Sequence, residues 1–202
     1  VIIASLNNQA YVCTSGNDVF AIASSIPTGV SRLEFAIAPS DPNYAYCLAA
    51  DVSGKLKNVY KSTDKGLTWT PMLTLVGTQF QIFGTNNSGS YSNSLAVFPD
   101  DKENLLLGGN DLWKYSPEQP WEQLTASDVS SLSPKYIHAY IHTIVFPKNY
   151  SSSNPIVFVG CDGGIHKSIN NGMDWAIMNK NYSTTMCTTI GYSSFGAVIG
   201  GT

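Results

Sequence analysis

The feature that most constrains how this chain can fold is a short motif that it uses twice. The stretch YKSTDKGLTW covers residues 60–69, and HKSINNGMDW covers residues 166–175. An Asp or Asn side chain can bond the backbone amides that follow it, and glycine supplies the positive φ of a tight turn. We therefore expect two equivalent structural turns, each anchored by a tryptophan that packs on a sheet. The motif residues are Ser62, Asp64, Gly66 and Trp69 in the first copy and Ser168, Asn170, Gly172 and Trp175 in the second.

The first motif copy has Asp64 where the second has Asn170, and this difference distinguishes a structural role of the side chain from a chemical one. A turn of this type tolerates Asn in place of Asp, whereas a nucleophile or a general acid does not. The motif is weaker at a third place, YSPEQPW, where Ser116 and Trp121 are kept but the Asp and the Gly are missing. The motif side chains are therefore predicted to shape turns rather than to carry out chemistry.

The tryptophans of these three turns mark a longer repeat. Trp69, Trp121 and Trp175 lie 52 and 54 residues apart, and short apolar runs separated by polar turns fill each interval. Only 12% of the residues are charged, and Ser, Thr, Asn and Tyr supply most of the polarity, which favours short strands over helices. Four short strands in each repeat of about 40–50 residues predict an all-β fold, a β-propeller.

We expect one partial propeller domain of about four blades, each with four antiparallel strands. The expected parts are the end of a preceding blade at 1–30, a blade with the motif at 31–75, a degenerate blade at 76–130, a second blade with the motif at 131–180 and the start of a further blade at 181–202. Since closed rings usually have roughly four to eight blades, the remaining blades are expected to belong to a larger polypeptide or complex.

Composition narrows the classes of partner. The net charge is −3 and the 11 Lys and Arg residues form no basic run, so nucleic acid is not an expected partner. No apolar stretch is long enough to span a bilayer, so no membrane insertion is expected. The four cysteines form no Cys-x-x-Cys pair, and neither a metal nor a cofactor is expected. Two disulfides or four buried thiols are the alternatives for Cys13, Cys47, Cys161 and Cys187.

The two motif copies resemble the Asp-box, or bacterial neuraminidase repeat (BNR). Asp-boxes occur in sialidases, in sortilin-type propellers, in xyloglucan-cleaving propellers and in many large secreted bacterial proteins. The last third of the chain, including DGGIHKSINNGMDW from residue 162, is also similar to repeats of exported Bacteroidetes proteins, although Tyr140 stands where that pattern has an Asp. The resemblance implies export, in that phylum by type IX secretion, and protein or carbohydrate partners at the cell surface.

The resemblance does not bring a complete catalytic site into this chain. Sialidases need an arginine triad, and Arg32 is the only arginine. Xyloglucan-cleaving propellers use two Asp residues across a cleft, for which Asp111 and Asp162 are the best candidates, since each follows a comparable strand. A turn-forming or solvated role is the alternative for both. We therefore predict a non-catalytic module that binds a protein or a glycan. The alternative is a glycoside hydrolase, xyloglucanase-like or sialidase-like, whose active site other blades complete.

Histidine and aromatic side chains are the candidate ligand-binding groups. The run YIHAYIHTIVF is expected to be a strand, which as the innermost strand of its blade would set His138 and His142 on one side of the central channel. Together with Tyr140 they are the candidates for ligand binding, and ordinary hydrogen-bonded histidines are the alternative. In a strand the two histidines stand about 13 Å apart, too far to share a metal ion. Aromatic rings can also stack on sugars, and the candidates are Tyr91, Tyr136, Tyr140, Tyr150 and Tyr182, with Trp113 a weaker one.

Overall fold

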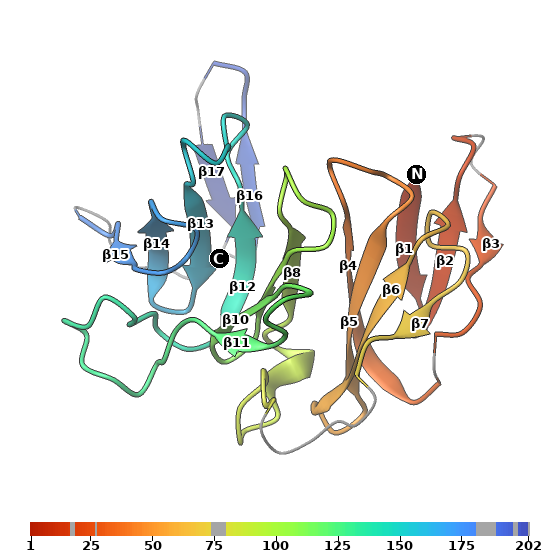
Figure 1. The fold of residues 1–202 in the computed structure, drawn as a ribbon, viewed down its shortest axis with the longest axis horizontal. Coiled ribbons are helices and arrows are strands. Elements are labelled where there is room, and N and C mark those ends of the chain that lie inside the picture. Colours follow the sequence, from red (N-terminus) through yellow and green to blue (C-terminus); the bar gives the residue numbers. More distant parts are fainter. Residues whose placement is uncertain (17–18, 27, 74–79, 181–188, 196–197, 202) are drawn as a thin grey trace.

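The computed structural model describes residues 1–16, 19–26, 28–73, 80–180, 189–195 and 198–201. These residues form five antiparallel β-sheets and one short 3-10 helix, η1 (Ser88–Ser90), which confirms the predicted all-β fold. Each sheet consists of strands that follow one another along the chain (Figure 1). No helix among these residues is long and apolar enough to cross a membrane.

Sheets 2, 3 and 4 each contain four strands in chain order. Sheet 2 consists of β4 (Val30–Ile37), β5 (Ala45–Asp51), β6 (Leu56–Ser62) and β7 (Thr70–Pro71). Sheet 3 consists of β8 (Ser94–Val97), β9 (Leu105–Gly108), β10 (Leu112–Tyr115) and β11 (Glu122–Gln123). Sheet 4 consists of β12 (Ile141–Val145), β13 (Val157–Cys161), β14 (Gly164–Ser168) and β15 (Ala176–Ile177). Each is the four-stranded antiparallel unit of a propeller blade.

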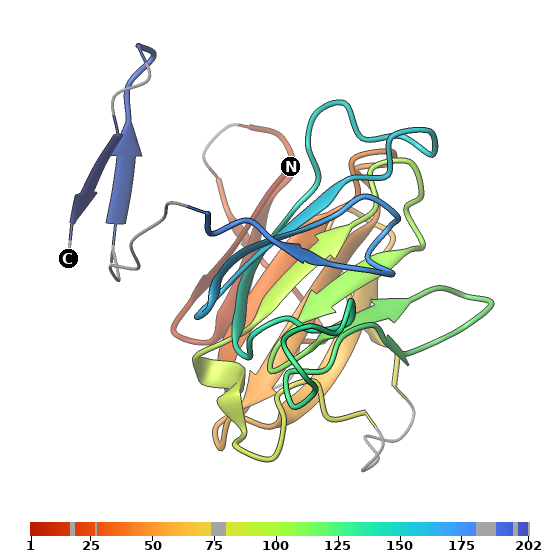
Figure 2. The same cartoon turned by 90° about the vertical axis from the view of Figure 1, so that its left-hand side faces the viewer.

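Sheets 1 and 5 contain fewer strands. Sheet 1 consists of β1 (Ile2–Leu6), β2 (Gln9–Cys13) and β3 (Ala21–Ile22). Sheet 5 is the hairpin of β16 (Thr189–Tyr192) and β17 (Val198–Gly201), which stands apart from the other four sheets in Figure 2. The series of sheets is that of a partial β-propeller, while the blade boundaries given above stay a prediction.

The inner strands β4, β8 and β12 lie next to one another, and the sheets stand face to face in chain order (Figure 1). Because neighbouring strands run in opposite directions, the turns alternate between two ends of each sheet. The turns at 52–55, 109–111 and 162–163 lie at the same end as the segments that lead into β8 and β12, and we call this the entry end. The two motif turns, at 63–69 and 169–175, lie at the opposite end, the motif end.

Strand β9 shows how the sequence builds this stack. Its three consecutive leucines are fully buried, with Leu105 and Leu107 in the core between sheets 2 and 3 and Leu106 in the core between sheets 3 and 4. Side chains alternate between the two faces of a strand, so an uninterrupted apolar run fits a strand that is covered on both faces. Burial of each leucine contributes about 1.5–3 kcal/mol to stability. A third core, which contains Trp69, joins sheets 1 and 2.

One predicted strand is shorter than expected. Within the run YIHAYIHTIVF, strand β12 begins only at Ile141. Tyr140 has a left-handed conformation with φ 67°, which interrupts an extended chain, because its peptide group bonds to turns of two neighbouring sheets. The strand prediction for residues 136–140 is therefore wrong, and His138 lies in the loop before β12 rather than on the innermost strand.

Candidate functional site

The first motif copy forms a closed, hydrogen-bonded turn between β6 and β7. Ser62 Oγ, in a side chain that is 1% exposed, accepts the amides of Gly66 (2.9 Å) and Asp64 (3.4 Å) and donates to Asp64 Oδ1 (2.7 Å). The Asp64 carboxylate accepts the amide and the hydroxyl of Thr68 at 2.9 and 2.6 Å. Burial opposes ionisation, but the hydrogen bonds from Thr68 and Ser62 prevail and lower the pKa of Asp64. Trp69 is buried and donates its indole N–H to Gly66 O (2.9 Å).

The second copy repeats this geometry with an amide in place of the carboxylate. Ser168 Oγ accepts the amide of Gly172 at 2.8 Å and donates to Asn170 Oδ1 at 2.9 Å. Asn170 Oδ1 accepts the amide of Asp174 at 3.0 Å, and Trp175 donates to Gly172 O at 2.9 Å. The bonds to the turn need only the oxygen that Asp and Asn share, so the exchange keeps the turn intact. These are the contacts that a structural role of the motif requires.

The degenerate third copy keeps only part of the turn. Ser116 Oγ accepts the amide of Gln119, three residues on, at 3.2 Å, in place of the glycine amide four residues on in the other two copies. Trp121 has a positive φ of 64° and packs against Phe80 and Tyr115, with ring centroids 4.6 and 4.7 Å apart. Its ring therefore contacts the outer part of the core between sheets 2 and 3.

At the entry end, side chains from two sheets meet around one carboxylate. Asp162, in the β13–β14 turn, has Oδ1 2.6 Å from His142 Nε2 and accepts the Tyr91 hydroxyl at 3.1 and 3.2 Å. The rings of Tyr91 and His142 are nearly perpendicular, with centroids 4.9 Å apart. Tyr91 is 51% exposed, and the side chains of His142 and Asp162 are 37% and 32% exposed. We call these three residues and Tyr140 the entry cluster.

The hydrogen bonds fix the protonation of the tyrosine and the position of the acid. The hydrogen bond to Asp162 raises the pKa of Tyr91, with a smaller contribution from burial, so the phenol is a neutral donor. With a proton on Nε2, His142 is the second donor to the carboxylate. The entry cluster thus presents a fixed carboxylate beside exposed aromatic rings, a combination that can accept hydrogen bonds from a ligand and stack on it.

A β-bulge aims His142 at Asp162. Ile141 pairs with Cys161 and Thr143 pairs with Gly160, so His142 is the extra residue between two consecutive pairs. A bulge bends its strand and redirects the side chain of the additional residue. His142 therefore reaches the end of the β13–β14 hairpin instead of alternating with its neighbours across the sheet.

Tyr140 joins the entry ends of sheets 3 and 4 through its backbone. Its N–H donates to Asn110 O at 3.3 Å, and its carbonyl accepts the amide of Asp162 at 3.3 Å. Its ring lies edge-to-face with that of Tyr91, with centroids 5.6 Å apart, and its hydroxyl accepts Asn86 Nδ2 at 3.2 Å. Asn86 is a contact of the cluster that was not predicted from the sequence.

Arg32 holds the segment that carries Tyr91. From strand β4 its guanidinium donates to Tyr91 O at 3.0 Å and to Asn93 O at 3.1 Å. It also lies 3.3 Å from Glu34 Oε2, where burial raises the pKa of Glu34 more than the arginine lowers it. The arginine thus connects sheet 2 to the entry cluster, a positioning role that sequence reasoning missed although Arg32 is the only arginine.

Asp111 occupies a different environment from Asp162. Its Oδ1 accepts the amide of Ser127 at 2.7 Å, and its Oδ2 accepts Asn110 Nδ2 at 3.1 Å and Gln123 Nε2 at 3.4 Å. Burial raises the pKa of Asp111, although the hydrogen bonds from Asn110 and Ser127 favour the anion. Both oxygens are engaged by the same sheet and its following loop, so Asp111 braces that loop.

The remaining candidate residues lie outside the entry cluster. His138 packs on Gly163, where an added methyl group would overlap its ring, and its Nδ1 is 3.1 Å from Ala139 O. Trp113 is only 8% exposed in the core between sheets 2 and 3, so the prediction that it stacks on a sugar is wrong.

Two further tyrosines of the predicted set are half-buried. Tyr150 donates to Asn171 Oδ1 at 2.9 Å, and burial raises its pKa to about 12. Tyr136 packs near the buried His166. Tyr182 lies outside the described residues.

The cysteines form no reactive centre within the described part of the chain. Cys47 and Cys161 are free thiols, and burial raises the pKa of both. Cys13 is buried, and Cys187 lies outside the described residues. No group of three or more His, Cys, Asp or Glu that could hold a metal ion occurs among the residues described.

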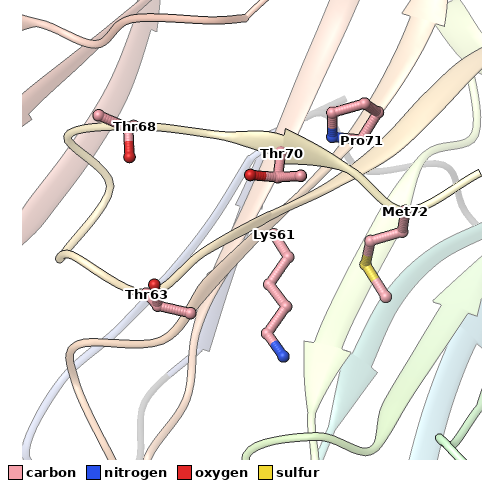
Figure 3. A pocket seen from close by; sticks show the side chains of 6 residues that line it. All are labelled: Lys61, Thr63, Thr68, Thr70, Pro71 and Met72. Atoms are coloured by element: carbon pink, nitrogen blue, oxygen red, sulfur yellow. The ribbon is translucent and has the colours of Figure 1, made fainter.

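A shallow pocket lies on sheet 2 near the motif end, with a volume of about 310 Å³ (Figure 3). Its lining combines a lysine, three threonines and two apolar side chains, namely Lys61, Thr63, Thr68, Thr70, Pro71 and Met72. Lys61 is paired with Glu103 at 2.6 Å, and Thr68 donates to Asp64. The charged side chain of this pocket, Lys61, thus already has a partner.

Solved structures share this fold. A GH74 enzyme of Niastella koreensis is 24% identical and has a TM-score of 0.57, over 96% of this chain and 31% of that chain. The GH74 xyloglucanase of Xanthomonas campestris is 23% identical with a TM-score of 0.48, over 73% of this chain and 23% of that one. YCF48 of Cyanidioschyzon merolae is 13% identical with a TM-score of 0.48, over 86% of this chain and 50% of that one.

These likenesses bear on the fold alone. The chain spans about a third of the length of the Niastella enzyme, and the identity is too low to carry its activity over. No protein-family model matches the sequence, and no curated protein matches it. What the comparison with the Niastella enzyme supports is the fold, a part of a β-propeller.

Proposed function

We propose that this chain is a non-catalytic β-propeller module of a larger secreted or cell-surface protein, and that its entry end binds a protein or a glycan. The carrying observation is the entry cluster, in which an exposed tyrosine, a histidine and one fixed carboxylate face solvent at the junction of two sheets. The turn contacts of both motif copies support their assignment as Asp-boxes, and the resemblance to exported Asp-box proteins supports the location.

The absence of a paired acid favours binding over hydrolysis for the described residues. A glycosidase needs two carboxyl groups about 5–10 Å apart across the scissile bond. Asp162 is the only carboxylate of the entry cluster, and Asp111 is engaged by Ser127, Asn110 and Gln123. A glycoside hydrolase would need a second acid across the scissile bond from Asp162, and it stays the alternative.

The test separates binding from turnover on the same samples. The chain is titrated by calorimetry with a xyloglucan heptasaccharide, cellohexaose and sialyllactose, and each mixture is then analysed for released sugar. Tyr91→Ala and Asp162→Asn are compared with Thr70→Ala, which changes the pocket on sheet 2 and leaves the entry end intact.

We expect binding without sugar release, weakened at least tenfold by both entry-end substitutions and unchanged by Thr70→Ala. Tenfold corresponds to about 1.4 kcal/mol, within the reach of one lost stacking ring or hydrogen-bond acceptor. Sugar release that Asp162→Asn abolishes would overturn the proposal in favour of the hydrolase. Binding that only Thr70→Ala weakens would move the site to the motif end.

A further inference from the structure

The pairing register defines equivalent positions on the faces of sheets 2, 3 and 4. Residues that pair directly across two strands point to the same face. In each sheet one such pair joins the second strand to a lysine of the third strand, and the next pair on that face follows two residues away. The pairs are Tyr46–Lys61 and Leu48–Val59 in sheet 2, Leu106–Lys114 and Gly108–Leu112 in sheet 3, and Phe158–Lys167 and Gly160–Ile165 in sheet 4.

The lysines support this equivalence. Each ammonium group stands over an aromatic ring. The distances to the ring centroids are 5.0 Å for Lys61 and Tyr44, 5.6 Å for Lys114 and Phe98, and 5.8 Å for Lys167 and Phe158. The face that carries the lysine is therefore equivalent in the three sheets. In sheets 2 and 3 this face is turned toward the sheet that follows in the chain.

Burial on this face differs sharply between the sheets. Val59 is 0% exposed in the core between sheets 2 and 3, and Leu112 is 0% exposed in the core between sheets 3 and 4. The equivalent Ile165 of sheet 4 is 49% exposed. Val145, which pairs with Phe158, is 47% exposed, and Met178, which donates its amide to Ile165 O, is 49% exposed. Sheet 4 thus presents an apolar face whose counterparts are covered.

The opposite face of sheet 4 is covered at its centre. Val157 and Val159 are 0% exposed there, because sheet 3 covers them, while Ile177 on the short edge strand β15 is 61% exposed. An exposed apolar patch at the centre of a sheet is typical of an interface. The face formed by Val145, Ile165 and Met178, the open face, therefore needs an occupant.

The chain itself supplies a matching element. An antiparallel pair of strands follows sheet 4, as β8 and β9 follow sheet 2 and β12 and β13 follow sheet 3. Its second strand reads Val-Ile-Gly-Gly at 198–201, which is similar to the Leu-Leu-Gly-Gly at 106–109, where β9 ends at Gly108. The link between β15 and β16, residues 178–188, can reach roughly 35 Å when extended, which exceeds the width of one four-stranded sheet, about 15 Å.

We propose that the β16–β17 hairpin packs on the open face of sheet 4 as the inner half of the next blade. In Figure 2 the hairpin stands apart from this face. Docking sets β16 beside β12, as β12 lies beside β8, and it narrows the solvent-facing side of the entry cluster at His142 and Asp162. This inference does not depend on the proposed binding function.

Hydrogen exchange followed by mass spectrometry tests the proposal. An isolated two-stranded hairpin is at best marginally stable in water, so an undocked hairpin exchanges its amides fast. Ile165→Lys and Met178→Glu place a charge on the open face. Ile2→Lys is the matched control, because Ile2 is 51% exposed on β1, in another sheet. Far-ultraviolet circular dichroism confirms that each variant folds.

We expect the peptide covering 189–201 to exchange at least tenfold more slowly in the native chain and in Ile2→Lys than in the two open-face variants. Fast exchange of this peptide in the native chain would overturn the proposal. Protection that neither open-face variant changes would do the same. Protection that grows with protein concentration would assign the open face to a second copy of the chain and equally reject the hairpin as its occupant.

Discussion

Replacing Ser62 by alanine measures how much one motif turn contributes to stability. The substitution removes an oxygen that accepts the amide of Gly66 at 2.9 Å and donates to Asp64 at 2.7 Å, in a side chain that is 1% exposed. Within the described part of the chain Ser62 Oγ is the one acceptor of the Gly66 amide, so the substitution leaves that amide buried and unsatisfied, at a cost of about 1–3 kcal/mol. For a chain of this size about 2 kcal/mol corresponds to a fall in Tm of roughly 4–8 °C.

The assay is thermal unfolding followed by circular dichroism, with urea unfolding as a second measure. Ser168→Ala is expected to give an equal loss, because Ser168 bonds Gly172 in the same way. Ser152→Ala is the control, since Ser152 is an exposed turn residue and its loss should change stability by less than about 0.5 kcal/mol. A Ser62→Ala protein as stable as the Ser152→Ala control would refute the structural role of the motif.

Three further predictions follow from individual residues. The pKa of Asp64 is lowered in the folded chain, so its contribution to stability is present above the unfolded pKa of 3.8 and is lost as the pH falls through the folded pKa. Asp64→Asn should therefore flatten the acid limb of a stability–pH curve below about pH 4. Gly54→Ala should cost at least about 2 kcal/mol in urea unfolding, because Gly54 has φ 80° and an added methyl group overlaps the carbonyl oxygen of Asn87. Cys47 should escape a thiol reagent in the native chain and react only on unfolding, as peptide mapping can show, because it is buried with a raised pKa; native-state labelling would contradict its place in the core.

Local sequence patterns predicted more of the fold than of the candidate site. The spacing of Ser62, Asp64 and Gly66 specifies a turn through bonds within seven residues, so sequence alone was enough to expect it. The short apolar runs between polar turns likewise indicated strands, among them β9 and β13. Such features depend on neighbours along the chain.

The entry cluster depends on contacts that no local pattern encodes. Tyr91 and Asp162 are 71 residues apart, and they meet only because sheets 3 and 4 pack side by side. The bulge at His142 and the left-handed Tyr140 broke the alternation on which the strand prediction rested. Tyr91, His142 and Asp162 were each a candidate from the sequence, as an aromatic, a strand histidine and a turn acid. That they lie in contact could be seen only in the structure.

The most direct test of the account is a map of ligand contacts on the native chain. Amide NMR spectra of the 15N-labelled protein are recorded with the xyloglucan heptasaccharide, cellohexaose and sialyllactose in turn. The mass of each sugar is then measured by mass spectrometry. The account predicts shifted resonances at Tyr91, Tyr140 and Asp162 with every sugar molecule still intact. Shifts confined to the pocket at 61–72, or the appearance of shorter sugars, would contradict it.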